Sequence, residues 1–375
     1  MPILMRSLWP TAASTMPRLA RPAHGISVVV PTKHRLAALT TCLRAVVIAA
    51  ERAEEPVELI VLDDGEEDTV RRLLAAQSTP AGLSVRYVPR RAYGGDGPVR
   101  GRDHGVRHAR YDIVAFTDDD TVCDPEWLAR GLRRLRASPQ LAGLEGAVVP
   151  EVIPPLDAVR ARVVQSRVGG AFLTANMFLR RDAVLRAGSF QRLWDERRLT
   201  GALHFREDSD LALRVRDRVG PVPFEPALVV RHPVDQPGLR SHLHTARFFA
   251  LDAPFEQLHP EAIPSLRAAP LARFRIRAAC TALATLPLLG RRRTRTAGLA
   301  TLAACAIGVS LQVEWDLRAA GLRRTCTEEI RSATLRLPRS LLWCLIAGAS
   351  RVAGIVLVRS RLVPLRPDVS GCAQK

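Results

Sequence analysis

Residues 113–127 read I-V-A-F-T-D-D-D-T-V-C-D-P-E-W, so a short apolar run ends abruptly at three consecutive aspartates. A short apolar run bounded by polar residues is typical of a buried strand. The carboxylates of Asp118, Asp119 and Asp120 repel one another, and burying them costs free energy unless a positive charge lies among them. This stretch therefore predicts a buried strand whose end holds a cation.

The chain before this stretch alternates between apolar runs and amphipathic segments. Buried strands are expected at 26–30, 57–62, 83–88 and 113–117, and helices at 36–52, 67–77 and 99–110. This alternation predicts an α/β fold with a mostly parallel, Rossmann-like sheet that is flanked by helices. In such sheets, ligands bind outside the carboxyl ends of the strands.

Three of the predicted strand ends carry polar or acidic residues. They are Pro31-Thr32-Lys33, Asp63-Asp64 and Asp118-Asp119-Asp120. We expect these ends to form one site from three loops. Carboxylates at this spacing suit Mg²⁺ or Mn²⁺, which shares its coordination with substrate phosphates. The alternative is a helix N-cap, but Asp124 alone can cap the next helix, which leaves the aspartate triplet unexplained.

Other phosphate-binding motifs do not occur in the sequence. There is no G-x-x-x-x-G-K-[ST] loop. Residues 94–97 (G-G-D-G) neither match G-x-G-x-x-G nor follow the first predicted strand. These observations disfavour a P-loop enzyme and a dinucleotide-dependent dehydrogenase.

The charge of the chain is strongly uneven. Of a net charge of +18, most lies in residues 267–375, which contain 19 Lys and Arg against 5 Asp and Glu. A nearly balanced body with acidic strand ends does not favour nucleic acid as a partner, because these ends repel phosphate unless a metal intervenes. The seven cysteines include no C-x-x-C pair, which fits a reducing compartment and argues against a disulfide framework or a zinc site.

The basic tail contains three segments with little or no charge, at 278–290, 296–313 and 340–358. The second is 18 residues long and borderline for crossing a bilayer, the first is short, and Arg351 interrupts the third. Basic clusters flank the segments, as expected at a cytoplasmic membrane face. We predict a largely helical C-terminal region on the cytoplasmic side of the membrane; the alternative is a helical subdomain packed on the body or on a partner.

Several short motifs occur in order between residues 26 and 232. They are V-V-V-P-T at 28–32, L-D-D-G at 62–65, G-P at 97–98 with R-D-H-G at 102–105, F-T-D-D-D at 116–120, G-A-F at 170–172, G-S-F at 188–190, E-D at 207–208 and His232. As an ordered set, each at or near a predicted strand end, they make the chain resemble the family 2 glycosyltransferases. The resemblance implies the nucleotide-sugar-binding GT-A fold.

The resemblance also implies a role for each matching residue. The nucleotide sugar would contact Pro31, Thr32, Arg35, Asp63, Asp64, Arg102, Asp118 and Asp119. Asp120, Asp118 and His232 would hold Mg²⁺ or Mn²⁺. Asp208 would be the general base, and the acceptor side would include Trp194, Glu207 and Asp210.

The implied reaction is transfer of a single sugar from a nucleoside-diphosphate sugar to an acceptor hydroxyl, with inversion at the anomeric carbon. The acceptor would be an envelope glycan, a glycolipid or another small acceptor, and the basic tail favours a lipid-linked one. The Q-x-x-R-W signature of processive synthases does not occur, which disfavours polymerisation. Glu66 and Asp103 stand where the family commonly has Ser and Asn, so details of the nucleotide contact are open.

On this basis the chain divides into three parts. Residues 1–25 are expected to be a loose leader without a signal peptide. Residues 26–265 are expected to form the glycosyltransferase domain, with a nucleotide-binding half at 26–124 and an acceptor half at 125–265. Residues 266–375 would be the membrane-associated region.

Three other functions compete with this interpretation. A sugar-phosphate nucleotidyltransferase would have a Gly-rich loop after the first strand, where residues 31–35 (P-T-K-H-R) contain no glycine. A non-catalytic binding protein would not need two acidic motifs on one face. A glycosidase would use paired carboxylates but would leave the Asp63-Asp64 motif without a purpose.

Overall fold

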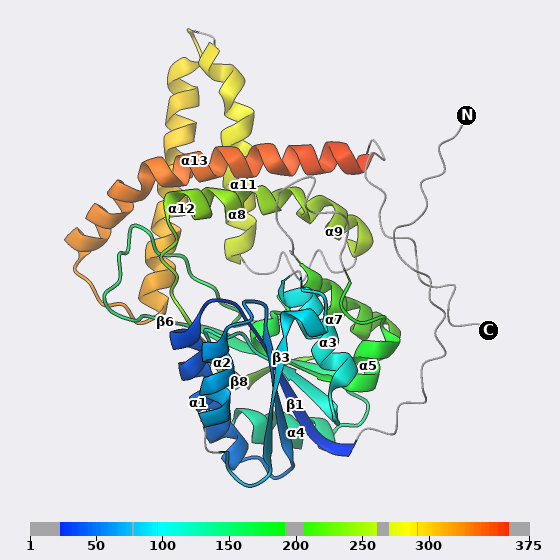
Figure 1. Cartoon of the computed structure of the whole chain (residues 1–375). Helices are drawn as coiled ribbons and strands as arrows, with labels where there is room; N and C mark the ends of the chain where they lie inside the picture. The colour runs from blue at the N-terminus through cyan, green and yellow to red at the C-terminus, as the bar shows by residue number, and fades with distance from the viewer. Residues whose placement is uncertain are drawn as a thin grey trace, which may run out of the picture.

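The computed structural model describes residues 23–76, 79–95, 97–191, 206–260, 270–290 and 292–359. In Figure 1 the chain forms a sheet covered by helices, with a group of long helices from the C-terminal part above it. Trp194, which is predicted on the acceptor side, lies outside the described residues.

An eight-stranded sheet with the order β3-β2-β1-β4-β7-β6-β8-β5 forms the centre of the body. Its first half contains β1 (Ala23–Thr32), β2 (Val57–Asp63), β3 (Leu83–Pro89) and β4 (Tyr111–Phe116). The pairings of β1 with β2, β2 with β3 and β1 with β4 are all parallel. The predicted α/β fold with parallel strands at these positions is confirmed.

The second half of the sheet is mixed. It contains β5 (Val122–Cys123), β6 (Gly143–Glu151), β7 (Met177–Arg180) and β8 (Phe224–Pro233). Strand β7 is antiparallel to both β4 and β6, and β5 is antiparallel to β8, whereas β6 and β8 are parallel. Parallel pairing therefore dominates only where the sequence alternates between strands and helices.

The register brings the predicted strand ends together. Thr32 at the end of β1 pairs with Asp63 at the end of β2, and Val29 pairs with Phe116 at the end of β4. Since these strands are parallel neighbours, the residues that follow them emerge at the same edge of the sheet.

Helices cover both faces of the sheet. Those on one face are α1 (Leu36–Glu51), α2 (Asp68–Ala76) and α4 (Trp127–Arg136). Those on the other are α3 (Pro98–His108), α5 (Arg181–Arg186) and α7 (Glu207–Arg218). Successive side chains of a strand point to opposite faces of the sheet. Val28 and Val30 of β1 therefore pack into the core under α1, α2 and α4, and Val29 packs into the core under α3, α5 and α7.

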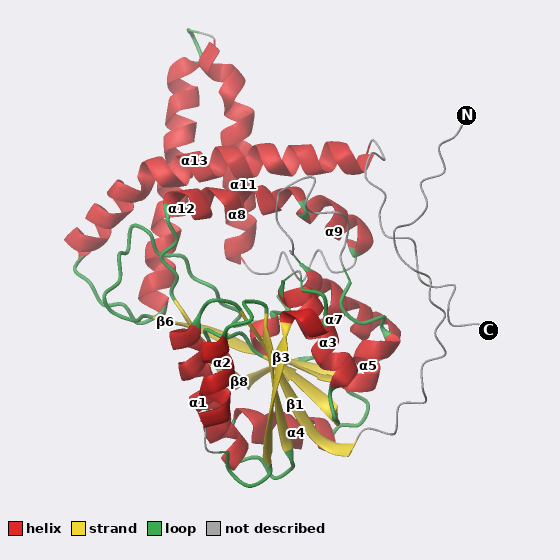
Figure 2. Ribbon diagram, in the orientation of Figure 1, coloured by secondary structure: helices red, strands yellow, loops and turns green. Residues whose placement is uncertain are grey.

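The C-terminal part is helical, as predicted. It contains α8 (Leu239–Ala246), α9 (Asp252–Leu258), α11 (Pro270–Thr285), α12 (Arg295–Ala319) and α13 (Cys326–Arg359). Helices α11 and α12 form a hairpin through the 3₁₀ turn Leu286–Gly290, and α13 runs across both (Figure 2). A Cβ atom on Gly348 of α13 would lie 2.4 Å from the carbonyl oxygen of Ala279, so only glycine allows this close approach to α11.

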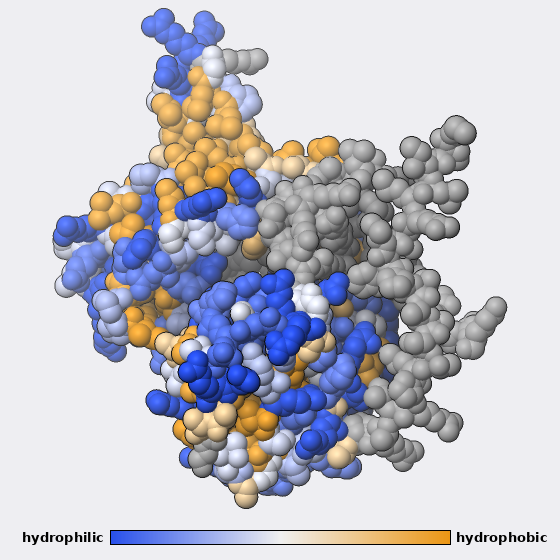
Figure 3. Space-filling model, in the orientation of Figure 1, coloured by the Kyte–Doolittle hydropathy of each residue, from blue (hydrophilic) through white to orange (hydrophobic). Residues whose placement is uncertain are grey.

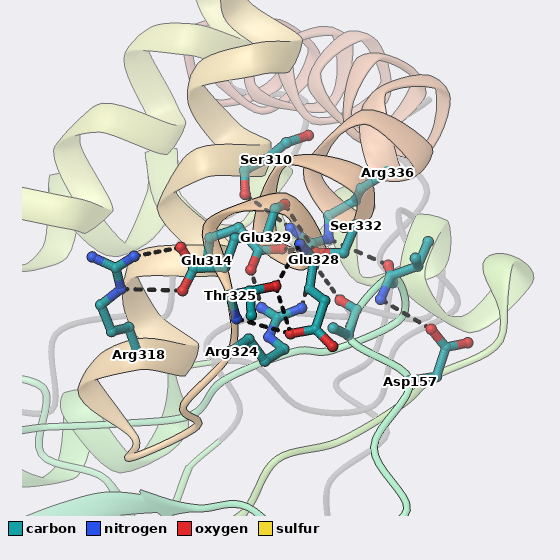
Figure 4. A network of polar contacts seen from close by, with 12 residues as sticks. Asp157, Ser310, Glu314, Arg318, Arg324, Thr325, Glu328, Glu329, Ser332 and Arg336 are labelled. Atoms are coloured by element: carbon teal, nitrogen blue, oxygen red, sulfur yellow. Dashed lines mark hydrogen bonds and ion pairs between the residues drawn. The ribbon is translucent and has the colours of Figure 1, made fainter.

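A buried polar network fastens α12 and α13 to the loop that follows β6 (Figure 4). Arg336 is 3% exposed and donates to the backbone carbonyls of Ala158, Val159 and Ser310. It also pairs with Glu314 at 2.9 Å, and the same carboxylate accepts from Ser332 at 2.5 Å. The network therefore ties the C-terminal helices to the body.

We expect Arg336→Met to lower the free energy of unfolding by about 3 kcal/mol, because it removes one partner of a buried ion pair and leaves three carbonyls without a donor. Urea unfolding of the detergent-solubilised full chain, followed by circular dichroism, measures the change. Arg331→Met is the matched control, since Arg331 is an exposed residue of the same helix. Equal stability of the two variants would contradict the structural role of Arg336.

Candidate active site

A cavity of about 600 Å³ opens at the carboxyl edge of the parallel strands. It is lined by residues at or after the ends of β1, β2 and β4. Others come from the 3₁₀ turn η1 (Arg90–Ala92), the start of α3, the end of β8 and the loop after β6. The lining residues are Pro31, Thr32, Lys33, Arg35, Leu62, Asp64, Arg90, Tyr93, Gly97, Pro98, Arg102, Asp118, Asp119, Asp120, Arg162, Val164, His232 and Asp235. The volume is within the range of small-molecule sites.

The end of β1 contacts the aspartate triplet directly. The hydroxyl of Thr32 donates to Asp119 Oδ2 at 2.7 Å. The guanidinium of Arg35 lies between two carboxylates, with Nη1 at 2.6 Å from Asp120 Oδ2 and 3.3 Å from Asp119 Oδ1. The positive charge that the triplet requires is therefore supplied in part by the chain itself.

One carboxylate oxygen of the aspartate triplet has no hydrogen-bond donor. Asp120 Oδ1 is buried and accepts no hydrogen bond. It lies 3.7 Å from His232 Nε2, while His232 Nδ1 is 2.8 Å from the carbonyl oxygen of Pro233. Since a carbonyl only accepts, Nδ1 carries a proton, and in the neutral form of the ring the lone pair of Nε2 points toward Asp120.

The lone pairs of Asp120 Oδ1 and His232 Nε2 then face each other, and both atoms can coordinate a cation placed between them. An imidazole nitrogen and a carboxylate oxygen both suit Mn²⁺, and the carboxylate suits Mg²⁺. An unpartnered buried carboxylate oxygen is costly unless a cation or a water satisfies it. Asp120 and His232 therefore fit the divalent cation that the sequence predicts.

Asp63 and Asp64, at the end of β2, lie in different environments. Asp63 is fully buried, and its two oxygens accept from the backbone N–H groups of Gly65 and Glu67, at 2.9 and 2.7 Å. Asp64 lines the cavity, where Oδ2 accepts from Lys33 at 3.0 Å and the buried Oδ1 has no hydrogen-bond donor. Asp63 thus shapes the turn, and Asp64 presents an acceptor to the cavity.

Arg102 joins the aspartate triplet to the E-D motif. Its Nη2 donates to Asp118 Oδ1 at 2.6 Å, and its Nη1 lies 3.8 Å from Glu207 Oε1. Arg102 and Glu207 are both buried. Asp118 and Glu207, which are 89 positions apart in the sequence, therefore share one cation at the side of the cavity.

Asp208 follows Glu207 in the first turn of α7. Its Oδ1 accepts from the backbone N–H of Ser209 at 2.7 Å, and Oδ2 lies 3.4 Å from the backbone N–H of Thr174. The residue is half-buried and has no cationic side chain within ion-pair distance among the described residues. Arg206, just before the helix, adopts a left-handed backbone with φ of +66°, a strained conformation for a residue with a side chain.

Asp210, which is predicted on the acceptor side, lies apart from the cavity. It is fully buried, and its Oδ2 pairs with Arg214 at 2.8 Å. Its Oδ1 lies 2.8 Å from Nε2 of His259. Asp210 therefore holds α7 against the segment around His259.

Burial raises the pKa of the acids in this region. The pKa of Asp119 rises to about 6 through burial, against the lowering effect of the Thr32 hydroxyl. Burial likewise raises the pKa of Asp120. The pKa of Glu207 rises through burial and the neighbouring Asp208, and that of Asp208 rises through burial.

Sequence reasoning missed several cavity residues. Tyr93 and Arg90 follow β3, and the only signal for them is an aromatic and basic stretch after a predicted strand. Arg162 and Asp235 form an ion pair at the opposite wall, and no motif marks either of them. Their proximity depends on how β6 and β8 pair.

Another cluster of side chains that could coordinate a metal lies at the amino ends of the strands. His24, Glu55 and Asp112 place ligand atoms within 4.8 Å of one another. Arg136 pairs with both acids at 2.5 Å, so a guanidinium already supplies a positive charge to this cluster. The predicted cation site at the carboxyl edge is separate from this cluster.

Comparison with known proteins identifies the segment that builds most of the cavity. The model of the family described as glycosyl transferase family 2 matches residues 27–148. Residues 27–148 belong to glycosyl transferase family 2. This family 2 segment covers β1 to β5 and most of β6, whereas Glu207, Asp208 and His232 lie beyond it.

Relatives of the family 2 segment include enzymes of polysaccharide and glycolipid synthesis. The hyaluronan synthase of Pasteurella multocida is 30% identical over 111 residues, which are 29% of this chain and 11% of the synthase. The undecaprenyl-phosphate 4-deoxy-4-formamido-L-arabinose transferase of Sodalis glossinidius is 28% identical over 106 residues, 28% of this chain and 32% of the transferase. The match thus spans only a tenth to a third of these relatives.

Among solved structures, the mannosyltransferase PcManGT from Pyrobaculum calidifontis, in complex with GDP-Man and Mn²⁺, aligns with 18% identity and a TM-score of 0.47. The alignment covers 90% of this chain and 91% of that chain.

Proposed function

We propose that this protein is an inverting glycosyltransferase that moves one sugar from a nucleoside-diphosphate sugar to an acceptor hydroxyl. The observation that carries the proposal is the pair of Asp120 Oδ1 and His232 Nε2, which face each other in a cavity of the family 2 segment. A divalent cation held there would neutralise the negative charge that develops on the departing diphosphate.

The cations of the cavity are placed to bind the diphosphate. Lys33, Arg35 and Arg102 line one cavity with the aspartate triplet. Arg35 is more than half exposed at its side chain, so it is free to exchange its carboxylate partners for phosphate oxygens. Asp118 would join Asp120 and His232 around the metal on this interpretation.

The wall beyond β2 and β3 is suited to the base of the nucleotide. Asp64 Oδ1 is buried, accepts no hydrogen bond and lies 3.8 Å from Arg90 Nε, so it can accept from an N–H of a base. Tyr93 lines the same wall and provides an aromatic face for stacking. Thr32 and Pro31 close the cavity next to this wall.

Asp208 is the proposed general base. It lies next to Glu207, which Arg102 links to the aspartate triplet, and its carboxylate is held by two backbone N–H groups rather than by a cationic side chain. Burial raises the pKa of this carboxyl group, against the lowering effect of the Ser209 N–H and of the charges on Arg102 and Arg206, so the base keeps its proton affinity. Attack from the side opposite the diphosphate would invert the anomeric carbon.

The acceptor is proposed to be a glycan or glycolipid intermediate, with a lipid-linked acceptor favoured. The relative from Sodalis glossinidius carries undecaprenyl phosphate in its name. Two C-terminal helices are long and apolar enough to cross a membrane by length and composition, α12 and residues 326–356 of α13. A location on the cytoplasmic side of the membrane is part of this proposal.

The raised pKa of Asp208 predicts a pH dependence. Its carboxylate is the active form, and burial raises its pKa above the ordinary value of 3.8. Activity should therefore fall as the pH decreases through this raised pKa, at a higher pH than for an ordinary aspartate. A profile of kcat/KM against pH measures the apparent pKa at which activity is lost on the acidic side. An apparent pKa at or below the ordinary value of 3.8 would contradict the assignment of Asp208.

A survey of donors tests the proposed function. The full chain, in detergent or vesicles with Mn²⁺, would be incubated with hexoses linked to UDP, GDP and dTDP. Release of a nucleoside diphosphate from one donor supports sugar transfer. Consumption of a sugar phosphate and a nucleoside triphosphate with release of pyrophosphate would support the nucleotidyltransferase alternative instead.

A further inference from the structure

Exposed apolar side chains concentrate in the C-terminal helices. Ten of the fifteen large hydrophobic residues that are exposed in the described part of the chain belong to residues 286–356. They are Leu286, Leu299, Ile307, Leu311, Trp315, Ile330, Leu335, Leu342, Val352 and Val356. Figure 3 shows hydrophobic residues gathered on the α11–α12 hairpin, with hydrophilic residues at its tip.

Helix α13 has two opposite faces. At about 100° per residue, its five exposed apolar residues fall within an arc of about 140°. They are Ile330, Leu335, Leu342, Val352 and Val356. Its buried arginines, Arg336 and Arg351, together with Arg339, lie on the opposite side of the helix. The helix therefore presents one exposed stripe that is apolar apart from Arg331, and one basic stripe that is turned the other way.

The basic stripe of α13 is bound to the body. Arg336 donates to the carbonyls of Ala158 and Val159, and Arg339 donates to that of Pro237 at 2.8 Å. Arg351 pairs with Glu256 at 2.5 Å. If α13 crossed a bilayer, each of these bonds would break and the arginines would enter hydrocarbon, which is costly. The length and hydropathy of α13 fit a span, and these contacts with the body argue against one.

The α11–α12 hairpin continues past α13, away from the body (Figure 1). Helices α12 and α13 meet where Ser310 Oγ lies 2.9 Å from Ser340 Oγ. Ser310 is near the end of the uncharged run 296–313, whose 18 residues span about 27 Å as a helix, close to the roughly 30 Å of a hydrocarbon core. Below this crossing, Glu314 and Asp316 of α12 are buried against the body.

We propose that the C-terminal helices dock onto a bilayer with anionic lipids, with α13 lying flat in the interface and the α11–α12 hairpin inserted into the hydrocarbon. The apolar stripe of α13 faces the lipid while its arginines hold the body at the surface. With the hairpin inserted over this length, Arg292, Arg293 and Arg295 at its tip reach the anionic headgroups of the opposite leaflet. This geometry does not depend on sugar transfer, so it can fail while the proposed function stands.

Vesicle flotation tests the docking surface. The full chain is mixed with phosphatidylcholine vesicles that contain phosphatidylglycerol. The triple variant Leu335→Glu, Leu342→Glu and Val352→Glu should reduce the bound fraction at least about ten-fold, since it places charges in the apolar stripe. Ile48→Glu, at an exposed apolar residue of α1, is the matched control and should bind as the wild type does. Equal binding of the triple variant would overturn the proposal.

Depth measurements test the orientation of α13. A fluorescent unnatural amino acid is placed at Leu335, Leu342, Val356 or Ala303, one per variant, and quenched by lipids brominated near the headgroup or at mid-chain. Ala303 is an exposed residue of α12 midway between the arginines of the tip and Ser310. The three α13 probes should share one shallow depth, and the Ala303 probe should be deep. A depth that changes along α13 would mean that α13 spans the bilayer. An absence of quenching at every position, together with a dimer in detergent, would mean that a second copy covers this surface. Either result would overturn the proposal.

Discussion

Asp208→Asn is expected to lower kcat by about 10²- to 10⁴-fold while the affinity for the nucleoside diphosphate stays unchanged. The amide keeps the shape of the carboxylate and an oxygen for the N–H of Ser209. It cannot accept the proton of the acceptor hydroxyl, so the loss should appear in the chemical step. Steady-state kinetics with the donor found in the survey, together with calorimetry of diphosphate binding, separate the two quantities.

The control for this prediction is Asp217→Asn on the same helix. Asp217 is exposed and pairs with its neighbour Arg216. This variant should keep wild-type kcat. If Asp208→Asn retained full activity, the general base would have to be another group. If it lost donor affinity in proportion to kcat, Asp208 would act in donor binding rather than in proton transfer.

Asp120→Asn is expected to abolish saturable Mn²⁺ binding and to lower kcat/KM by about 10²-fold or more. The loss of a ligand removes several kcal/mol of charge stabilisation at the diphosphate. Binding of Mn²⁺ to the protein alone, followed by electron paramagnetic resonance, gives a readout that does not depend on activity. His232→Gln should weaken the metal as well, because the amide is a poorer ligand than imidazole.

Asp124→Asn is the control for the metal prediction. Asp124 lies four residues further along the chain, outside the cavity, and its Oδ1 accepts from the backbone N–H of Glu126. Its variant should bind Mn²⁺ as the wild type does. Unchanged Mn²⁺ affinity in Asp120→Asn would show that the facing lone pairs of Asp120 and His232 are not the metal site.

The sequence predicts the parallel half of the fold and the edge where the cavity lies. Its strands are continuous apolar runs, and parallel strands end at a common edge, so Thr32, Asp64 and Asp119 could be placed together before any coordinates existed. The second half of the sheet was not predictable in the same way. Strand β7 has four residues and β5 has two, which is too short for a periodic signal.

Part of the cavity wall is formed by residues that are far apart in the sequence, so no local sequence pattern predicts it. Arg162 pairs with Asp235, 73 residues later, only because β6 and β8 lie side by side. The division between Asp63 and Asp64 depends on which oxygens the turn after β2 uses. For α13, hydropathy alone favours a span, whereas the contacts of its arginines with the body, which the sequence does not show, give the helix a bound face.

We propose that the cavity at the carboxyl edge of β1, β2 and β4 is a metal-dependent nucleoside-diphosphate site. Calorimetry of UDP, GDP and dTDP binding to the full chain in detergent, with and without Mn²⁺, tests this site. One diphosphate should bind tightly only with Mn²⁺, and Asp120→Ala should remove this binding. If none of the three bound under either condition, the acidic strand ends would not form a donor site.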